Sequence, residues 1–133
     1  MAANERHALG VRVAAFGRAL ARLEEALARE QDDLSRDGCI QRFEFTFDTA
    51  WKALQSRARI EGIDCASPRQ CLRAAFRLGL IDADPRWMQM AEDRNRTSQT
   101  YDEGTAREVF PALPGYLEVL KPLLQSLLSD LPT

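Results

Sequence analysis

The side chains of this sequence that could bind a ligand or take part in chemistry are concentrated between Arg94 and Tyr101. The Arg94 guanidinium can hold a carboxylate or a phosphate through two parallel hydrogen bonds, and the Tyr101 phenol can donate or accept one. Asn95 and Gln99 add two amides to the same segment. An amide does not titrate near neutral pH, so Gln99 cannot act as a general acid or base. The segment therefore favours binding over catalysis.

A second group of candidate binding residues is a row of arginines. Arg69, Arg73 and Arg77 follow one another at intervals of four residues, which places them on one face of a helix. Three guanidiniums on one face could bind phosphates or an acidic partner. An ordinary solvated helix face is the alternative interpretation, because helix surfaces are commonly charged.

Other catalytic, metal-binding and cofactor-binding patterns are missing from the sequence. Its one histidine, His7, lies in the N-terminal tail, far from the other candidate residues, and we expect it to be exposed to solvent. Cys39, Cys65 and Cys71 form no Cys-x-x-Cys pair, and their odd number predicts reduced, structural thiols. There is no glycine-rich phosphate loop and no Gly-x-Ser-x-Gly motif. We therefore expect no metal and no cofactor.

Composition limits the class of protein further. The 133 residues suffice for a single domain, residues 1–133, and 45% of them are apolar and 29% charged. No apolar run approaches the roughly 20 residues of a membrane span, and the N-terminus lacks the apolar stretch of a secretory signal, which predicts a cytoplasmic protein. The net charge of −2 provides no overall field that would attract nucleic acid, so DNA is not an expected partner.

Apolar residues recur at helical spacing through most of the chain, and the alternation typical of strands is scarce. A first helix is expected over residues 8–29, and a second from an N-cap at Asp37 to about residue 60. The expected buried stripes are Val13, Phe16, Leu20, Leu23 and Leu27 in the first helix, and Ile40, Phe43, Phe47, Trp51, Leu54 and Ala58 in the second.

Two shorter helices are expected in the middle of the chain, between Gly62 and Tyr101. Ser67 and Asp84 are each followed by a proline, the combination of an N-cap and a first helical residue. The residues expected to face inward are Leu72, Ala75, Phe76 and Leu80 in the first of these helices, and Trp87, Met90 and Ala91 in the second.

The last part of the chain also reads as helical. Thr105 begins a capping box, with Asp102 as an alternative start. Leucines at 117, 120, 124, 127 and 131 restore a spacing of three and four, and Pro122 predicts a kink or a later start for this last helix. Together the segments predict an all-α fold, an antiparallel up-and-down four-helix bundle with one broken helix.

Two residues on the expected apolar stripes carry charge and therefore need partners. Glu44 lies close in angle to Ile40 and Phe47, and Arg94 shares a face with Met90. We hypothesise that Glu44 and Arg94 approach each other across the bundle, where a purely structural ion pair that fixes helix register is the alternative.

Three stretches of the sequence, residues 41–47, 50–52 and 94–103, resemble the nucleotidyltransferase substrate-binding proteins, small all-helical members of the HEPN superfamily. Residues 67–81 extend the resemblance, which covers most of the chain. Members of the superfamily often carry an Arg and an Asn, a few residues, a His, one residue and a Tyr. Arg94, Asn95 and Tyr101 match this pattern, and Gln99 stands in place of the His.

The resemblance implies a binding subunit, not an enzyme, that works beside a separately encoded minimal nucleotidyltransferase, which would hold the catalytic aspartates. Arg94, Asn95, Gln99 and Tyr101 would line a site for substrate or nucleotide, with Glu44 behind Arg94. In toxin members a partner can nucleotidylate the Tyr, which makes Tyr101 a candidate acceptor and a toxin-antitoxin pair an expected setting.

The oligomeric state is expected to be a homodimer. The family implies it, and an aromatic residue at Phe45, on the nominal solvent face of the second helix, predicts either an oligomer interface or cover by another element.

Two other functions stay open. The Arg and His of the motif form an RNase site in many HEPN proteins, so the chain could be an RNase toxin that Gln99 has disabled. It could also be a purely structural dimeric scaffold, in which Phe45 lies in the interface and Arg94 only supports the fold.

Overall fold

The computed structural model describes residues 2–131, and within that range all the regular secondary structure is helical, without a strand. Six α-helices follow one another, and the 3₁₀ turn Phe110–Ala112 joins the last two. Their bounds are α1 Ala2–Leu27, α2 Asp33–Ile60, α3 Pro68–Arg77, α4 Pro85–Gln99, α5 Glu103–Val109 and α6 Leu113–Ser129. The prediction of an all-α fold is confirmed.

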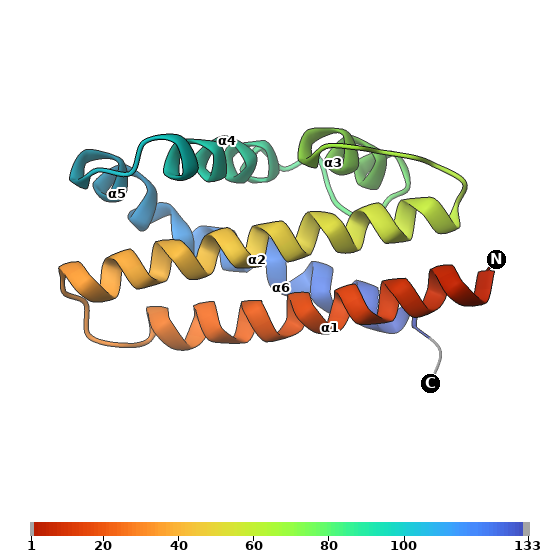
Figure 1. Cartoon of the computed structure of the whole chain (residues 1–133), viewed down its shortest axis with the longest axis horizontal. Helices are drawn as coiled ribbons and strands as arrows, with labels where there is room; N and C mark the ends of the chain where they lie inside the picture. Colours follow the sequence, from red (N-terminus) through yellow and green to blue (C-terminus); the bar gives the residue numbers. More distant parts are fainter. Residues whose placement is uncertain (1, 132–133) are drawn as a thin grey trace.

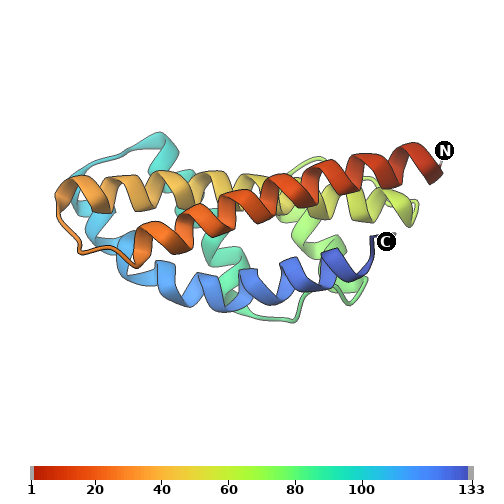
Figure 2. The ribbon, with the colours of Figure 1, turned by 90° about the horizontal axis from the view of Figure 1, so that it is seen from below.

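The helices form an up-and-down bundle (Figure 1). The helices α1, α2 and α6 are its three long rods, and α3 and α4 lie end to end along α2 as a fourth rod that is broken at residues 78–84. Figure 2 shows α6 beside α1 and opposite to it in direction. The broken helix predicted from the sequence is thus the α3–α4 rod. No helix within residues 2–131 has the length and apolar character needed to cross a bilayer.

The core follows the predicted stripes of the first two helices closely. All the predicted positions are buried except Leu27 and Trp51, which are partly buried and pack against the core. In α6, Leu120 and Leu127 are buried as predicted, whereas Leu117, Leu124 and, just beyond the helix, Leu131 are only partly buried. The stripe is completed instead by Leu113, Tyr116 and Leu123. The helix begins at Leu113 and runs through Pro122, so the alternative of a later start after this proline is wrong.

Side-chain caps set most of the helix starts. Ser67 and Asp84 cap α3 and α4 as predicted, and Asp102, the alternative start, caps α5 by accepting a hydrogen bond from the Thr105 amide. The predicted N-cap Asp37 is wrong. Asp32 caps α2 by accepting from the Ser35 amide at 2.7 Å, so α2 starts one turn earlier.

Two further predictions about the middle segment are wrong. Phe76 does not face inward, since α3 packs through Cys71, Leu72 and Ala75 and leaves Phe76 51% exposed. Cys65 and Cys71 are not reduced but form a disulfide. The chain turns back at Ser67 to begin α3, which brings the two Cα atoms within 5.2 Å, a separation typical of disulfides. Cys39 is free and buried, as predicted.

Two leucines of α6 provide a matched test of this core. Leu120 is fully buried and Leu128 is 46% exposed. We expect Leu120→Ala to lower the free energy of unfolding by about 2–5 kcal/mol, because it removes packed methyl groups and leaves a cavity. Leu128→Ala should change it by less than about 0.5 kcal/mol. Urea unfolding followed by circular dichroism measures both, and equal effects would contradict the arrangement of α6.

Candidate functional site

The centre of the candidate site is Arg94, which α4 presents to two carboxylates of α2. Its Nη1 donates to Glu44 Oε2 at 2.9 Å, which confirms the predicted pairing of these residues. Its Nε and Nη2 donate to the two carboxylate oxygens of Asp48 at 3.1 and 2.9 Å, a bidentate contact. The prediction missed Asp48, although it lies four residues after Glu44 and hence on the same face of α2.

This cluster is partly buried and fully paired. Hydrogen bonds from Arg94 to Asp48, and to a lesser extent to Glu44, raise the pKa of Arg94 above its ordinary value although burial opposes the charge. Arg94 therefore stays cationic at any pH the protein meets. Because two carboxylates face one guanidinium, the cluster carries a net negative charge and does not by itself attract phosphate.

Two hydroxyl groups near the C-terminal end of α4 also belong to the site. Thr97 is buried, and its Oγ1 donates to Glu44 Oε2 at 2.7 Å. The Tyr101 hydroxyl donates to Asp37 Oδ1 at 2.5 Å across the gap to the start of α2. Partial burial and the Asp37 carboxylate raise the pKa of Tyr101, so the phenol is protonated at neutral pH. Asp37 is thus a partner of Tyr101, and not the helix cap predicted from the sequence.

A hollow of about 440 Å³ lies between the first turns of α2 and the C-terminal end of α4. Both Tyr101 and Glu44 line it, and its remaining lining is mostly from α2. The lining residues are Leu34, Asp37, Gly38, Gln41, Glu44, Thr97 and Tyr101. Asp37 and Glu44 can only accept hydrogen bonds, whereas the other polar side chains of the lining can both donate and accept, which suits a ligand that presents hydroxyl or amino groups.

The structure brings together only part of the predicted site. Arg94, Glu44 and Tyr101 belong to one connected region, whereas Asn95 and Gln99 are exposed on α4 and form no side-chain hydrogen bond with residues 2–131. Phe45 is 56% exposed on α2, next in sequence to Glu44. Phe45 lies on the solvent face as predicted, and no element within residues 2–131 covers it, so the alternative of cover by another element is wrong. Its role in a dimer stays a prediction.

Residues predicted outside the site are also exposed. Arg69, Arg73 and Arg77 lie on the surface of α3 and form no ion pair within the part of the chain that the structure describes. His7 is exposed on α1, as predicted. The described residues contain no group of three or more His, Cys, Asp or Glu side chains arranged to hold a metal ion.

A buried network behind the site was missed. Asp93 is 3% exposed and accepts hydrogen bonds from the Tyr116 hydroxyl and, at 3.1 Å, from Gln89. Burial, followed by this contact with Asp93, raises the pKa of Tyr116. Arg96 bridges Asp93 and Glu108 and so ties α4 to α5. The position of Asp93, three residues after the buried Met90, was the signal that could have indicated its burial.

Comparison with known proteins gives a consistent result. Residues 11–129 match the family described as "Nucleotidyltransferase substrate binding protein like". A Haemophilus influenzae protein named "Probable ribonuclease HepT" is 32% identical over 95 residues, which are 68% of this chain and 65% of that protein. The chain thus matches slightly less than two thirds of that relative's length.

Two solved structures share the fold. One is the crystal structure of a protein from Thermus thermophilus, with 39% identity and a TM-score of 0.78, covering 84% of this chain and 98% of that one. The other, from Haemophilus influenzae, is described as revealing the fold of a substrate binding domain of a nucleotidyltransferase. It has 26% identity and a TM-score of 0.77, covering 86% of this chain and 98% of that one.

The fork between Arg94 and Asp48 can be tested through stability. Arg94→Lys keeps the charge but cannot make the bidentate contact, so we expect the free energy of unfolding to fall by about 1–3 kcal/mol. The neighbouring variant Asn95→Ala, at an exposed residue, should change it by less than about 0.5 kcal/mol. Urea titrations of both variants make the comparison. An Arg94→Lys protein as stable as the original would show that the fork does not hold α4 to α2.

Proposed function

Because the chain belongs to the nucleotidyltransferase substrate binding protein like family, we propose that it is a non-catalytic helical subunit that pairs with a separately encoded small nucleotidyltransferase. The observation that carries the proposal is the connected region of Arg94, Glu44, Asp37 and Tyr101 beside a hollow of about 440 Å³. The described fold of the Haemophilus influenzae neighbour supports the same function.

In this proposal Arg94, Asn95, Gln99 and Tyr101 line the surface that receives substrate or nucleotide, and Glu44 holds Arg94 in place. The ion-paired Arg94 positions the end of α4 instead of neutralising phosphate, because its cluster is net negative. The exposed amides of Asn95 and Gln99 and the acceptors of the hollow suit the base and ribose of a nucleotide.

We propose Tyr101 as an acceptor of a nucleotidyl group. In the reaction the phenolic oxygen would attack the α-phosphorus of a nucleoside triphosphate held by the partner enzyme, the new O–P bond would form, and pyrophosphate would leave. The raised pKa of Tyr101 means that its proton must be removed as the bond forms. The Asp37 carboxylate already accepts a hydrogen bond from the Tyr101 hydroxyl at 2.5 Å, so it could accept the phenolic proton.

The setting we propose is a homodimer in the cytoplasm, as part of a toxin-antitoxin pair. The exposure of Phe45 close to the site supports a dimer that covers it. The Cys65–Cys71 disulfide is the observation that argues against the cytoplasm, because disulfides are rare in that reducing compartment. The cytoplasmic setting therefore requires this disulfide to persist in a reducing compartment.

A specific observation favours one alternative function. A relative of this chain is named as a probable ribonuclease, so an RNase with a disabled motif is the second candidate. Gln99 is exposed and hydrogen-bonds to none of the described side chains, so a histidine would fit there without displacing a structural contact. A purely structural scaffold is the third candidate, and it requires neither nucleotide nor enzyme.

The role of Tyr101 is tested by purifying the protein from its native cells and weighing the Tyr101 peptide. We expect a small nucleotidyltransferase to accompany the protein and to add nucleotide mass to Tyr101 when a nucleoside triphosphate is supplied. Asp37→Asn, which keeps a hydrogen-bond acceptor but is a poor base, should slow the addition roughly 100-fold. The control Asp33→Asn, at an exposed residue of the same helix, should not.

The outcomes separate the proposals. Recovery of this protein alone and unmodified would contradict the paired subunit and favour the scaffold. A nucleotidyltransferase that accompanies the protein but leaves Tyr101 unchanged would keep the pairing and exclude the acceptor role. Equal rates of nucleotide addition for Asp37→Asn and the original protein would exclude only the role of Asp37 as the base.

The RNase alternative is tested by restoring the histidine that Gln99 replaces in the motif. We expect neither the original protein nor Gln99→His to cleave RNA, since we propose a binding subunit. Gln99→Asn is the control, because it changes the side chain without adding a group that titrates. Cleavage of a fluorescent RNA by Gln99→His alone would identify a disabled nuclease. Cleavage by the original protein would overturn the non-catalytic assignment.

A further inference from the structure

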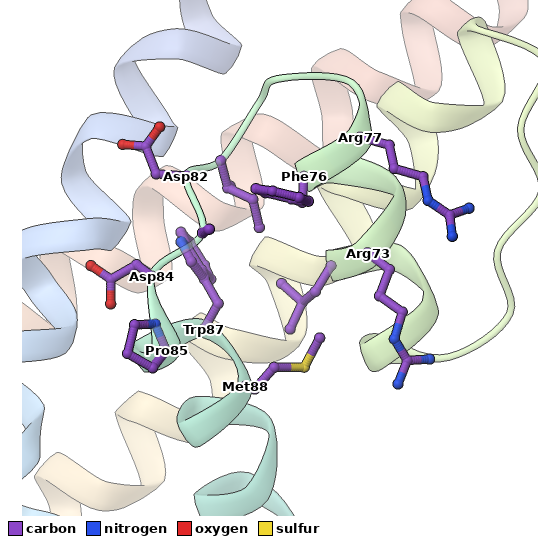
Figure 3. A pocket seen from close by; sticks show the side chains of 11 residues that line it. Arg73, Phe76, Arg77, Asp82, Asp84, Pro85, Trp87 and Met88 are labelled. Atoms are coloured by element: carbon purple, nitrogen blue, oxygen red, sulfur yellow. The ribbon is translucent and has the colours of Figure 1, made fainter.

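A second hollow, of about 520 Å³, lies between α3 and the first turn of α4, at a distance along α4 from the Tyr101 site. Figure 3 shows Phe76, Trp87 and Met88 around it, with Pro85 at the start of α4. Its lining is mostly carbon, because the charged ends of the surrounding side chains point away from it (Figure 3). None of the charged side chains that line it is buried, unlike the polar anchors of a typical small-molecule site.

The hollow leaves apolar surface in water. Phe76 is 51% exposed and Met88 37% exposed, and both border it. Large apolar side chains that gather around a hollow mark interaction surfaces more often than scattered ones do. Phe76 was expected in the core, and its outward position leaves an aromatic side chain available to a partner.

Charge around the hollow is unequal on its two sides. Arg73 and Arg77 lie on one rim and Asp82 and Asp84 on the other (Figure 3). Asp84 is bound to Arg86 at 2.8 Å, so Asp82 is the only carboxylate of the described lining whose charge is not paired. The arginines form no ion pair or side-chain hydrogen bond among residues 2–131, and Arg69 continues their row. The rim therefore has an unneutralised positive row on α3.

We propose that this hollow and its arginine row form a docking groove for an acidic amphipathic helix of a partner protein. The three arginines follow one another every four residues, about 6 Å apart along the helix axis. Carboxylates at the same four-residue interval on a partner helix match that repeat, while its apolar stripe covers Phe76 and Met88. The groove is distinct from the Tyr101 site, and the proposal stands whether or not the proposed function is right.

The test uses synthetic helical peptides of about 18 residues with leucines at intervals of three and four. One peptide flanks the leucines with glutamate and the other with lysine, and fluorescence anisotropy measures their binding to the full chain. We expect the glutamate peptide to bind at least about tenfold more tightly. The triple variant Arg69→Glu, Arg73→Glu, Arg77→Glu should reverse that preference, and Phe76→Ser should weaken both complexes.

A matched variant decides the location of binding. The triple variant Arg6→Glu, Arg18→Glu, Arg22→Glu makes the same change of charge at exposed residues of α1 and should keep the original preference. All these residues are exposed, so circular dichroism should show unchanged folding for every variant.

Three results would overturn the proposal. The first is that both triple variants lose the preference for the glutamate peptide to the same extent, which would show that overall charge, and not the groove, causes that preference. The second is an absence of glutamate-peptide binding to the original protein. The third is a dimer in solution that Phe76→Ser dissociates, which would show that a second copy of this chain occupies the groove.

Discussion

The structure depends on the fact that α2 contacts each of the other five helices. A helix in that position keeps only one stripe for water, which carries Gln41, Phe45 and Lys52, and ten of its side chains are buried on its other faces. Polar groups on it are then acceptable only when a neighbour satisfies them. The buried Thr46 hydroxyl donates to the carbonyls of Arg42 and Ala19. Glu44 and Asp48 instead receive the guanidinium of Arg94, so the same constraint that builds the bundle fixes α4 against α2.

Sequence periodicity predicted the parts of the fold that depend on one helix at a time. The stripes of α1 and α2 were correct because a long amphipathic helix has a single solution for its buried face. The starts of α3 and α4 were correct because an N-cap followed by proline is a local signal. The Glu44–Arg94 pair was predictable because a charge on an apolar stripe requires a partner of the opposite sign.

The errors arose where two segments had to be placed relative to each other. Asp32 and Asp37 are both plausible caps by type, and only the position of Tyr101 gives Asp37 a different partner. Phe76 was expected on the inward face of α3, but α3 packs against α2 through the face that carries Cys71 and Ala75. The Cys65–Cys71 disulfide depends on the turn before α3, which spacing alone does not reveal.

The two candidate surfaces share one rigid element. Met88, in the first turn of α4, borders the apolar groove, and Gln99 ends the same helix next to the Tyr101 region. Eleven residues of α-helix separate them, about 17 Å along the axis. A protein interface of ordinary size, about 800 Å² on each partner, spans such a distance. A partner domain of that size that faces both surfaces could place a helix in the groove and still reach Tyr101. Because Arg94 and the Asp93–Tyr116 contact hold α4 to α2 and α6, the spacing between the two surfaces is set by the fold and would select partners whose own features match it.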